Sequence, residues 1–213
     1  MQPISKNLAL ATSGILRWLA SFLVLLVITG CTTTSYPPAP SQAGVADYNY
    51  RVGALDIVNV IVWRNPELSV SIPVRPDGKI TVPLVDDLQA LGKTPTELER
   101  DVEQALGKYI REPVVTIIVT KFAGPIEDQV RVIGEVNKPQ FMAYRKGLTA
   151  LDVMIDAGGL TDFADGNGAR IFRASEKGKL YTVRLRDLLK RGDITANVEM
   201  SPGDILIVPQ SWF

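Results

Sequence analysis

The feature that most constrains the fold is one strongly marked amphipathic helix, set between short segments rich in β-branched residues. It lies in KTPTELERDVEQALGKYI, residues 93–110, where Thr94 takes the N-cap position and Pro95 the first helical position. Glu97 stands where it closes a capping box with Thr94. The apolar positions share one face: Leu98, Val102, Leu106 and Tyr109. Because such a stripe must be buried against a second layer, we predict that this helix packs on a sheet.

Strand patterns on both sides of the helix supply that sheet. YRVGALDIVNVIVW predicts a strand, a turn around Gly53 and Asp56, and a second strand through Trp63. LSVSIPVRPDGKITVPLV predicts a hairpin that turns at Pro-Asp-Gly, residues 76–78. EPVVTIIVTKF is a largely continuous apolar run, which is typical of a strand buried on both faces. These segments and the helix form one small α+β unit.

A second block of mixed structure follows. VRVIGEVNKPQFMAYRKG predicts two strands with a turn at residues 137–139. Thr149 caps a short helix, and Gly158 is placed to end it in the left-handed conformation. A hairpin turning at 176–178, a helical turn in DLLKRGD and a closing strand in VEMSPGDILIVPQSWF come next. This order predicts a β-grasp sheet with a helix across it, so the fold class is α+β with two small mixed domains.

The N-terminus indicates export. Residues 1–46 contain no Asp or Glu, and Lys6 and Arg17 are their only charges. The apolar run WLASFLVLLVI spans 11 residues, whereas a membrane-spanning helix needs ~20. A positive start, a short apolar core and small residues are typical of a secretory signal. The order ITGC, ending at Cys31, resembles the bacterial lipobox, whose cysteine is acylated and becomes the first residue.

We therefore predict a lipoprotein signal peptide over 1–30, lipidation of Cys31 and a flexible tether over 31–46. The alternative is a buried cysteine behind an ordinary signal peptide. Thr32 stands where an Asp would indicate retention in the inner membrane. The expected location is the periplasmic face of the outer membrane of a Gram-negative bacterium, with the protein held by its lipid.

The composition excludes several classes of function. The chain has no histidine and one cysteine, which removes the usual general base, the Ser-His-Asp and Cys-His arrangements and an internal disulfide framework. Its 23 basic residues balance 23 acidic ones, so no footprint for nucleic acid is visible. We predict no catalytic residues, no cofactor, no metal and no nucleic-acid partner.

Two groups of carboxylates are candidate sites. Asp86 and Asp87 form the most suggestive pair, because glycosidases use two carboxylates ~5–10 Å apart. Neighbours on an extended strand point to opposite faces, so we interpret the pair as a solvated turn. Asp162 and Asp165 lie in a Gly-rich loop whose oxygens suit calcium, but the loop lacks the ligand spacing of an EF-hand. The loop follows a helix rather than preceding one, which argues against a phosphate cradle.

Two other features leave alternatives open. YRVGALDIVNV and VEMSPGDILIV share an order of strand, turn, Asp and apolar strand, which makes Asp56 and Asp204 equivalent. We expect each Asp to bond the backbone of its own turn rather than a ligand. Trp212 and Phe213 are either a strand end tucked into the core or an aromatic anchor for a partner.

Four segments in order resemble the polysaccharide export domain of outer-membrane export lipoproteins, the Wza-like family: YRVGALDIVNVIVW, VRPDGKITVPLV, LGKTPTELERDVEQAL and REPVVTIIV. VIGEVNKPQFMAYRKGLTALDVMIDAGGLTDFA resembles the SLBB β-grasp module that follows it. We place the export domain at 47–124 and the SLBB domain at 125–213. Two turns depart from the family and put local geometry in doubt. Ala54 and Leu55 stand where it often has Pro-Gly, and Gln140 follows a proline where it often has glycine.

The resemblance implies a ring of identical subunits around a channel for capsular or extracellular polysaccharide. Long members of the family end in a helix that crosses the outer membrane, whereas this chain ends at Phe213. The expectation is the short type, whose ring passes polymer to a separate outer-membrane β-barrel and faces an inner-membrane chain-length (co-polymerase) protein. The ending VPQSWF is similar to the subgroup associated with exosortase and PEP-CTERM clusters.

The residues that line such a channel are not marked in the sequence. Arg64, Asn65 and Lys79 are candidates, although ordinary solvation explains them equally well. Two other functions stay open: a glycan-binding or scaffold lipoprotein that forms no channel, and a carboxylate-based glycan lyase or hydrolase.

Overall fold

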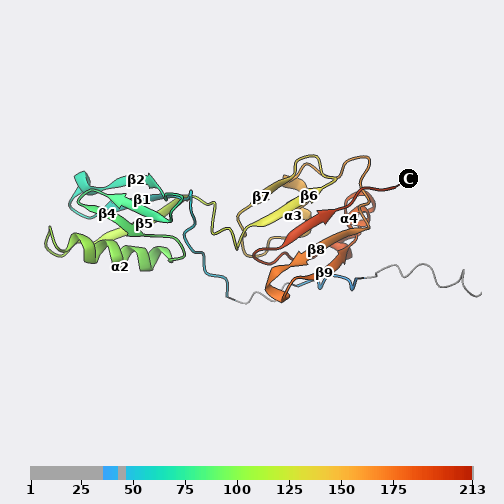
Figure 1. The fold of residues 1–213 in the computed structure, drawn as a ribbon, viewed down its shortest axis with the longest axis horizontal. Coiled ribbons are helices and arrows are strands. Elements are labelled where there is room, and N and C mark those ends of the chain that lie inside the picture. The colour runs from blue at the N-terminus through green and yellow to red at the C-terminus, as the bar shows by residue number, and fades with distance from the viewer. Residues whose placement is uncertain (1–35, 43–46, 213) are drawn as a thin grey trace, which may run out of the picture. The chain divides into compact units, whose positions relative to one another are not determined.

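The structure is a computed structural model that describes residues 36–42 and 47–212. The predicted signal peptide, Cys31 and Phe213 lie outside the described residues. Two mixed α+β domains follow one another along the chain, as predicted (Figure 1). The first contains β1 (Ile57–Val62), η1 (Pro66–Leu68), β2 (Val70–Pro73), β3 (Lys79–Val82), β4 (Val85–Gln89), α2 (Pro95–Leu106) and β5 (Val115–Lys121).

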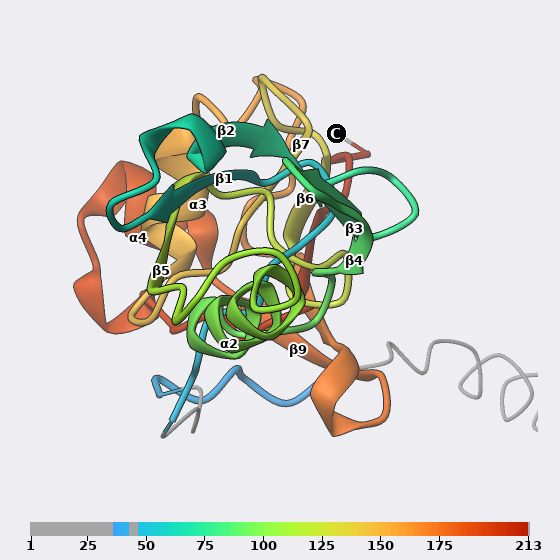
Figure 2. The same ribbon diagram turned by 90° about the vertical axis from the view of Figure 1, so that its left-hand side faces the viewer.

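The first domain is built around the predicted helix. Strands β2, β1 and β5 form an antiparallel sheet, and β3 pairs with β4. In Figure 2, α2 is flanked by β5 on one side and by the β3–β4 pair on the other. Its capping box is formed by Thr94 and Glu97, and Leu98, Val102 and Leu106 are buried in the core. The prediction for Tyr109 is wrong: the helix ends at Leu106, and Tyr109 is exposed.

The predicted hairpin between β2 and β3 is wrong in its pairing. The turn at residues 76–78 is present, and the amide of Arg75 donates to the carbonyl of Lys79 (2.9 Å). However, β2 pairs with β1, and the ladder continues when the amide of Val74 donates to the carbonyl of Asp56 (2.8 Å). Strand β2 and Val74 thus bond to β1 and to the residue before it, and β3 pairs with β4 instead of β2.

Strand β5 is not buried on both faces, as its apolar run predicted. It lies at the edge of the sheet, with Ile117 buried and Ile118 45% exposed. On its free edge, the amides of Val115 and Ile117 donate to the carboxylates of Glu103 and Glu99 on α2 (2.9 Å each). Carboxylates four residues apart on a helix therefore cover alternate amides of an edge strand.

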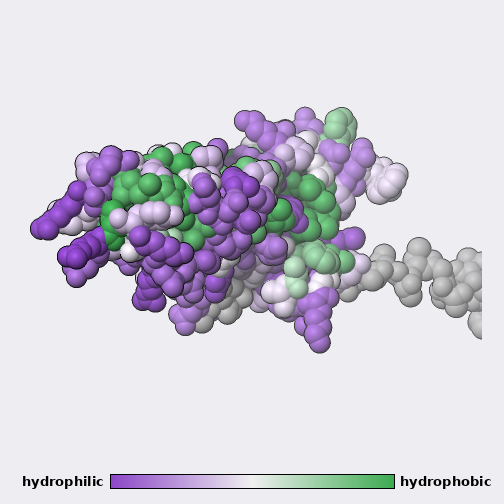
Figure 3. Space-filling model, turned by 60° about the vertical axis from the view of Figure 1, so that its left-hand side comes forward, coloured by the Kyte–Doolittle hydropathy of each residue, from purple (hydrophilic) through white to green (hydrophobic). Residues whose placement is uncertain are grey.

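Apolar side chains remain on the outer face of this sheet. Ile61, Trp63 and Ile118 are among the exposed residues. Figure 3 shows apolar and hydrophilic residues interspersed on the face that it draws.

The second domain contains β6 (Val130–Gly134), β7 (Gln140–Met142), α3 (Ala150–Asp156), β8 (Ala169–Arg173), η2 (Ala174–Glu176), β9 (Lys179–Val183), α4 (Leu185–Arg191), η3 (Ile194–Ala196) and β10 (Ile205–Val208). The sheet has the order β7-β6-β10-β8-β9, and β10 runs parallel to β6. The closing strand thus enters the middle of the sheet, between the two predicted hairpins, which confirms the β-grasp order. Thr149 and Asp152 form a capping box on α3, and Gly158 adopts φ +74° as expected.

Candidate functional site

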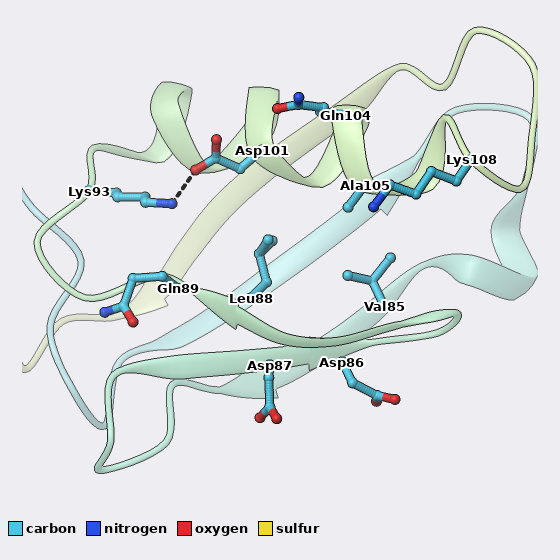
Figure 4. A pocket seen from close by; sticks show the side chains of 10 residues that line it. All are labelled: Val85, Asp86, Asp87, Leu88, Gln89, Lys93, Asp101, Gln104, Ala105 and Lys108. Atoms are coloured by element: carbon cyan, nitrogen blue, oxygen red, sulfur yellow. Dashed lines mark hydrogen bonds and ion pairs between the residues drawn. The ribbon is translucent and has the colours of Figure 1, made fainter.

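A polar groove lies between β4 and α2 in the first domain, with a volume of about 400 Å³ (Figure 4). Lys93 and Asp101 form an ion pair at one end, drawn as a dashed line. Gln89, Gln104 and Lys108 supply further amide and ammonium groups. Such groups can hydrogen-bond sugar hydroxyls, and the ion pair neutralises the charges of Lys93 and Asp101.

The carboxylates Asp86 and Asp87 belong to strand β4 rather than to a turn. Asp87 adopts φ +53°, and the pairing of β3 with β4 shifts register at this point. This bulge breaks the alternation of the strand, so both carboxylates point away from α2 (Figure 4). The prediction of opposite faces is therefore wrong.

Asp87 has a basic partner outside the groove. Arg75 donates to Asp87 (2.6 Å) and to Asp77 (2.5 Å). The side chains of Arg75 and Asp87 are 45% and 58% exposed, so the pair is screened by solvent. The arrangement ties the turn at residues 76–78 to β4 rather than presenting two free carboxylates.

Asp56 is a fully buried carboxylate with several donors. The amide of Gly53 donates to its Oδ2 (2.8 Å), which confirms the expected bond within the turn. The amides of Ala123 and Gly124 donate to its Oδ1 (2.6 and 2.9 Å), and the hydroxyl of Tyr50 also donates to the carboxylate. Asp56 therefore fastens the segment after β5 to the turn before β1.

The hydrogen bonds to Asp56 affect the pKa of Tyr50, and several of them were not predicted from the sequence. Burial, with the hydrogen bond to Asp56, raises the pKa of the Tyr50 phenol. The bond from Tyr50 and those from residues 123–124 were not predicted. Only the similarity between the two Asp turns pointed to Asp56.

Asp204 is fully buried in the second domain. The amide of Ser201 donates to its Oδ2 (2.8 Å), again as expected. Arg173 donates to the same oxygen through Nε and Nη2 (3.3 and 3.2 Å). Burial raises the pKa of Asp204, although the Ser201 amide and Arg173 oppose the shift.

The two departures from the family pattern leave the local geometry intact. Leu55 adopts φ +70°, close to the φ +77° of Gly203 at the equivalent position before Asp204. The first turn therefore keeps its shape with a leucine in the left-handed region. Gln140 begins β7 and pairs with Val132, so the second departure does not disturb the hairpin.

The other predicted sites have ordinary environments. The amide of Gly168 donates to Oδ1 of Asp165 (3.1 Å), which closes a turn. Among residues 36–42 and 47–212, no group of three or more His, Cys, Asp or Glu side chains is placed to hold a metal ion. Trp212 is 91% exposed, so the alternative of a terminus tucked into the core is wrong for this residue. Its role as an aromatic anchor stays a prediction, as does any role of Arg64, Asn65 and Lys79 in a channel.

Comparison with protein families decides the class. The profile described as "Polysaccharide biosynthesis/export protein" matches residues 45–120, and that of the SLBB domain matches residues 128–208. The chain belongs to the polysaccharide biosynthesis/export family. This Wza-like family is one of export proteins, not of enzymes.

Three relatives illustrate the family. The chain is 28% identical over 185 residues to the EPS I polysaccharide export outer membrane protein EpsA of Ralstonia nicotianae, covering 76% of this chain and 47% of that protein. It is 26% identical over 183 residues to EpsA of Ralstonia solanacearum, covering 75% and 47%. It is 26% identical over 166 residues to the exopolysaccharide production protein ExoF of Rhizobium meliloti, covering 67% and 38%. The chain thus spans about half the length, or less, of these relatives.

One further property of this family member concerns the membrane. Within the part of the chain that the structure describes, no helix has both the length and the apolar character needed to cross a bilayer.

Proposed function

We propose that this export-family protein is a periplasmic ring component of an exopolysaccharide or capsule export channel, anchored to the outer membrane through a lipid on Cys31. The observation that carries the proposal is the order of the two matched domains, export then SLBB, across residues 45–208. Relatives named as polysaccharide export outer membrane proteins match three quarters of the chain.

The geometry of the first domain suits a conduit. A polymer in transit needs many weak contacts rather than a tight site, and a neutral hydrogen bond contributes only ~0.5–1.5 kcal/mol net. Gln89 and Gln104 offer contacts of this kind along the groove. No bond is made or broken in transit, so a general base or a nucleophile has no role in the proposal.

The proposal includes partners on both sides. The ring passes polymer to a separate outer-membrane β-barrel and faces an inner-membrane chain-length (co-polymerase) protein. Cross-linking in cells followed by purification of the lipoprotein tests this part. Recovery of neither type of membrane protein, from cells that export polymer, would contradict it.

The groove also favours a second function, a glycan-binding or scaffold lipoprotein that forms no channel. The two functions differ in assembly. A ring should purify in detergent as a closed oligomer of identical copies. A monomer with measurable affinity for the cell's own oligosaccharide would favour the scaffold.

The decisive experiment compares polysaccharide on the cell surface with polysaccharide retained inside. The strains are a deletion strain and the same strain carrying the wild type or Cys31→Ser. We expect the deletion to lose surface polymer, the wild type to restore it, and the serine variant to restore it poorly. Unchanged surface polymer in the deletion strain, with no second copy of the gene, would overturn the export proposal.

A further inference from the structure

Two adjoining hollows share Phe122 and Ala143 in the unit Tyr36–Phe213. The first has a volume of about 430 Å³ and the second a volume of about 510 Å³, both within the size range of small-ligand sites. Their lining residues are separate from those of the polar groove between β4 and α2. Five aromatic side chains line the two hollows and are called the aromatic surface below: Tyr48, Tyr50, Phe122, Phe141 and Tyr144.

Contacts between the rings hold much of the aromatic surface in place. The hydroxyl of Tyr48 donates to Oδ2 of Asp128 (3.2 Å), and the Tyr48 ring packs edge-to-face against Tyr144 with 4.8 Å between the ring centres. The ring of Tyr50 packs against Phe122 in the same way, with 5.3 Å between the centres. Because these contacts restrict the rings before a ligand arrives, little side-chain entropy is lost on binding.

Two of the rings are open to solvent. Phe122 is 57% exposed and Phe141 is 63% exposed. The face of an aromatic ring carries partial negative charge, so it attracts polarised C–H groups. A pyranose ring presents such C–H groups on its face and keeps its hydroxyls at its rim. The exposed rings therefore suit a sugar, whose hydroxyls remain hydrated while its face is covered.

The charged groups in the lining indicate the sign of the ligand. Arg145 lines the first hollow and Lys121 the second, and none of the described residues that line either hollow is acidic. Arg145 has one weak ion pair, from its Nη2 to Oδ1 of Asp152 (3.7 Å). A guanidinium has further N–H donors and binds a carboxylate through two parallel hydrogen bonds. The two hollows therefore combine stacking surfaces with positive charge, which complements an acidic sugar.

We propose that the aromatic surface binds a short stretch of an acidic polysaccharide. The pyranose faces stack on the exposed rings of Phe122 and Phe141, and the carboxylates of uronic acid units bind Arg145 or Lys121. The inference rests on the proposed function and deepens it, because it names the class of polymer and a place where the protein contacts it. Stacking on exposed rings is weak for each sugar, as a polymer in transit requires.

The test measures binding to the full acylated chain in detergent by isothermal titration calorimetry. The probes are short fragments of the exopolysaccharide of the same strain, either native or with their carboxyl groups reduced to alcohols. We expect the native fragments to bind several-fold more tightly than the reduced ones. Phe122→Ala and Phe141→Ala should each weaken binding of the native fragments about 2–10-fold, the range of one aromatic contact. A polymer without acidic sugars, or equal affinity for both probes, overturns the inference.

Matched variants test the place of binding. Phe163→Ala removes a ring that is 66% exposed and lies outside the two hollows, so the affinity should not change. Lys121→Gln should reduce the preference for the native fragments, whereas Lys138→Gln, at another exposed lysine, should not. A loss as large with Phe163→Ala as with Phe122→Ala would indicate unspecific adhesion and overturns the inference. Binding that is lost only with Gln104→Ala lies in the polar groove and overturns it as well.

Two further measurements separate the possible failures. If Phe122→Ala and Phe141→Ala bind the fragments as the wild type does but no longer form the oligomer of the wild type in detergent, the aromatic surface is a contact between copies and the inference is wrong. A deletion strain that loses surface polymer leaves the export proposal standing in that case. A deletion strain that keeps its surface polymer overturns the export proposal, and the inference with it.

Discussion

Two turns of the molecule share one backbone geometry but compensate a buried carboxylate in different ways. Asp56 receives three backbone amides and a tyrosine hydroxyl. Asp204 receives one backbone amide and a buried arginine, Arg173. The turn motif therefore fixes where the carboxylate lies, whereas the surrounding chain decides whether dipoles or a cation stabilise it.

The same two turns differ at the residue before the aspartate. Leu55 and Gly203 both have positive φ, but only Leu55 has open space, with 60% of its surface exposed. A Cβ atom on Gly203 would lie 2.5 Å from the carbonyl oxygen of Glu127. Glycine is therefore required in one turn by a close neighbour and is absent from the other at the cost of backbone strain.

The largest expected effect comes from removing the buried cation. Arg173→Met leaves Asp204 without its basic partner, and breaking a buried ion pair costs about 3–5 kcal/mol. Both side chains are almost fully buried, so solvent does not screen the loss. The free energy of unfolding in urea measures it. The double variant Arg173→Met with Asp204→Asn should recover most of the loss, and a double variant as unstable as the sum of both single changes would contradict the account.

The next effect tests the requirement for Gly203. Gly203→Ala combines left-handed strain, about 1–2 kcal/mol, with a steric conflict, so we expect a loss above 2 kcal/mol in the same assay. Gly192→Ala is the matched control, because Gly192 has φ +69° and no heavy atom within 4 Å of the added Cβ. Equal losses for the two variants would show that the contact with Glu127 has no effect.

The third prediction makes the two turns alike. Leu55→Gly relieves the left-handed strain, and part of that gain is offset by the larger entropy of the unfolded glycine chain. We expect a rise of about 0.5–1 kcal/mol in the free energy of unfolding. Leu55→Ala keeps a Cβ and should give no rise. A loss of stability with glycine would mean that the leucine side chain contributes more than its exposure indicates.

The comparison also shows which parts of the structure the sequence could predict. Local hydrogen bonding decided the correct ones: the capping box of Thr94 and Glu97, the cap at Thr149, and the bonds of Asp56 and Asp204 to the backbone of their own turns. Each rests on residues within four positions of one another, where spacing fixes the geometry. The order of elements in the second domain was also predictable, since each turn has its own residue pattern.

Non-local pairing decided the failures. The choice of β1 rather than β3 as the partner of β2 depends on ladder bonds that no local pattern records. The common side of Asp86 and Asp87 results from a bulge against β3. The proline-rich segment at residues 36–42 pairs with Thr182 of β9, 145 residues after Pro37. In the candidate site, the helix α2 was predictable, but the groove was not, because it depends on how α2 and β4 meet.

The smallest expected effect concerns pH and again separates the two turns. Burial raises the pKa of Asp204 above its ordinary value of 3.8, so folding takes up protons where the pH lies between the two values. The contribution of Asp204 to stability is therefore complete below pH 3.8 and is lost as the pH rises through the folded pKa. The double variant Arg173→Met with Asp204→Asn lacks this group. The difference in unfolding free energy, wild type minus double variant, should decrease as the pH rises from below 3.8 through this window.

One other carboxyl differs between the two proteins: the pKa of Glu176 is lowered, chiefly by the Tyr181 hydroxyl and in part by Arg173, which the double variant lacks. Its contribution changes in the opposite direction and reduces, without reversing, the decrease expected for Asp204. Asp152 has no such contact with the two changed residues. The pKa of Asp152 is lowered, chiefly by the Thr149 hydroxyl, so its contribution changes in the opposite direction and is lost as the pH falls. It is present in both proteins and cancels in the difference. A difference that stays flat with pH, or that grows as the pH rises, would mean that Asp204 is ionised throughout and that Arg173 outweighs the effect of burial.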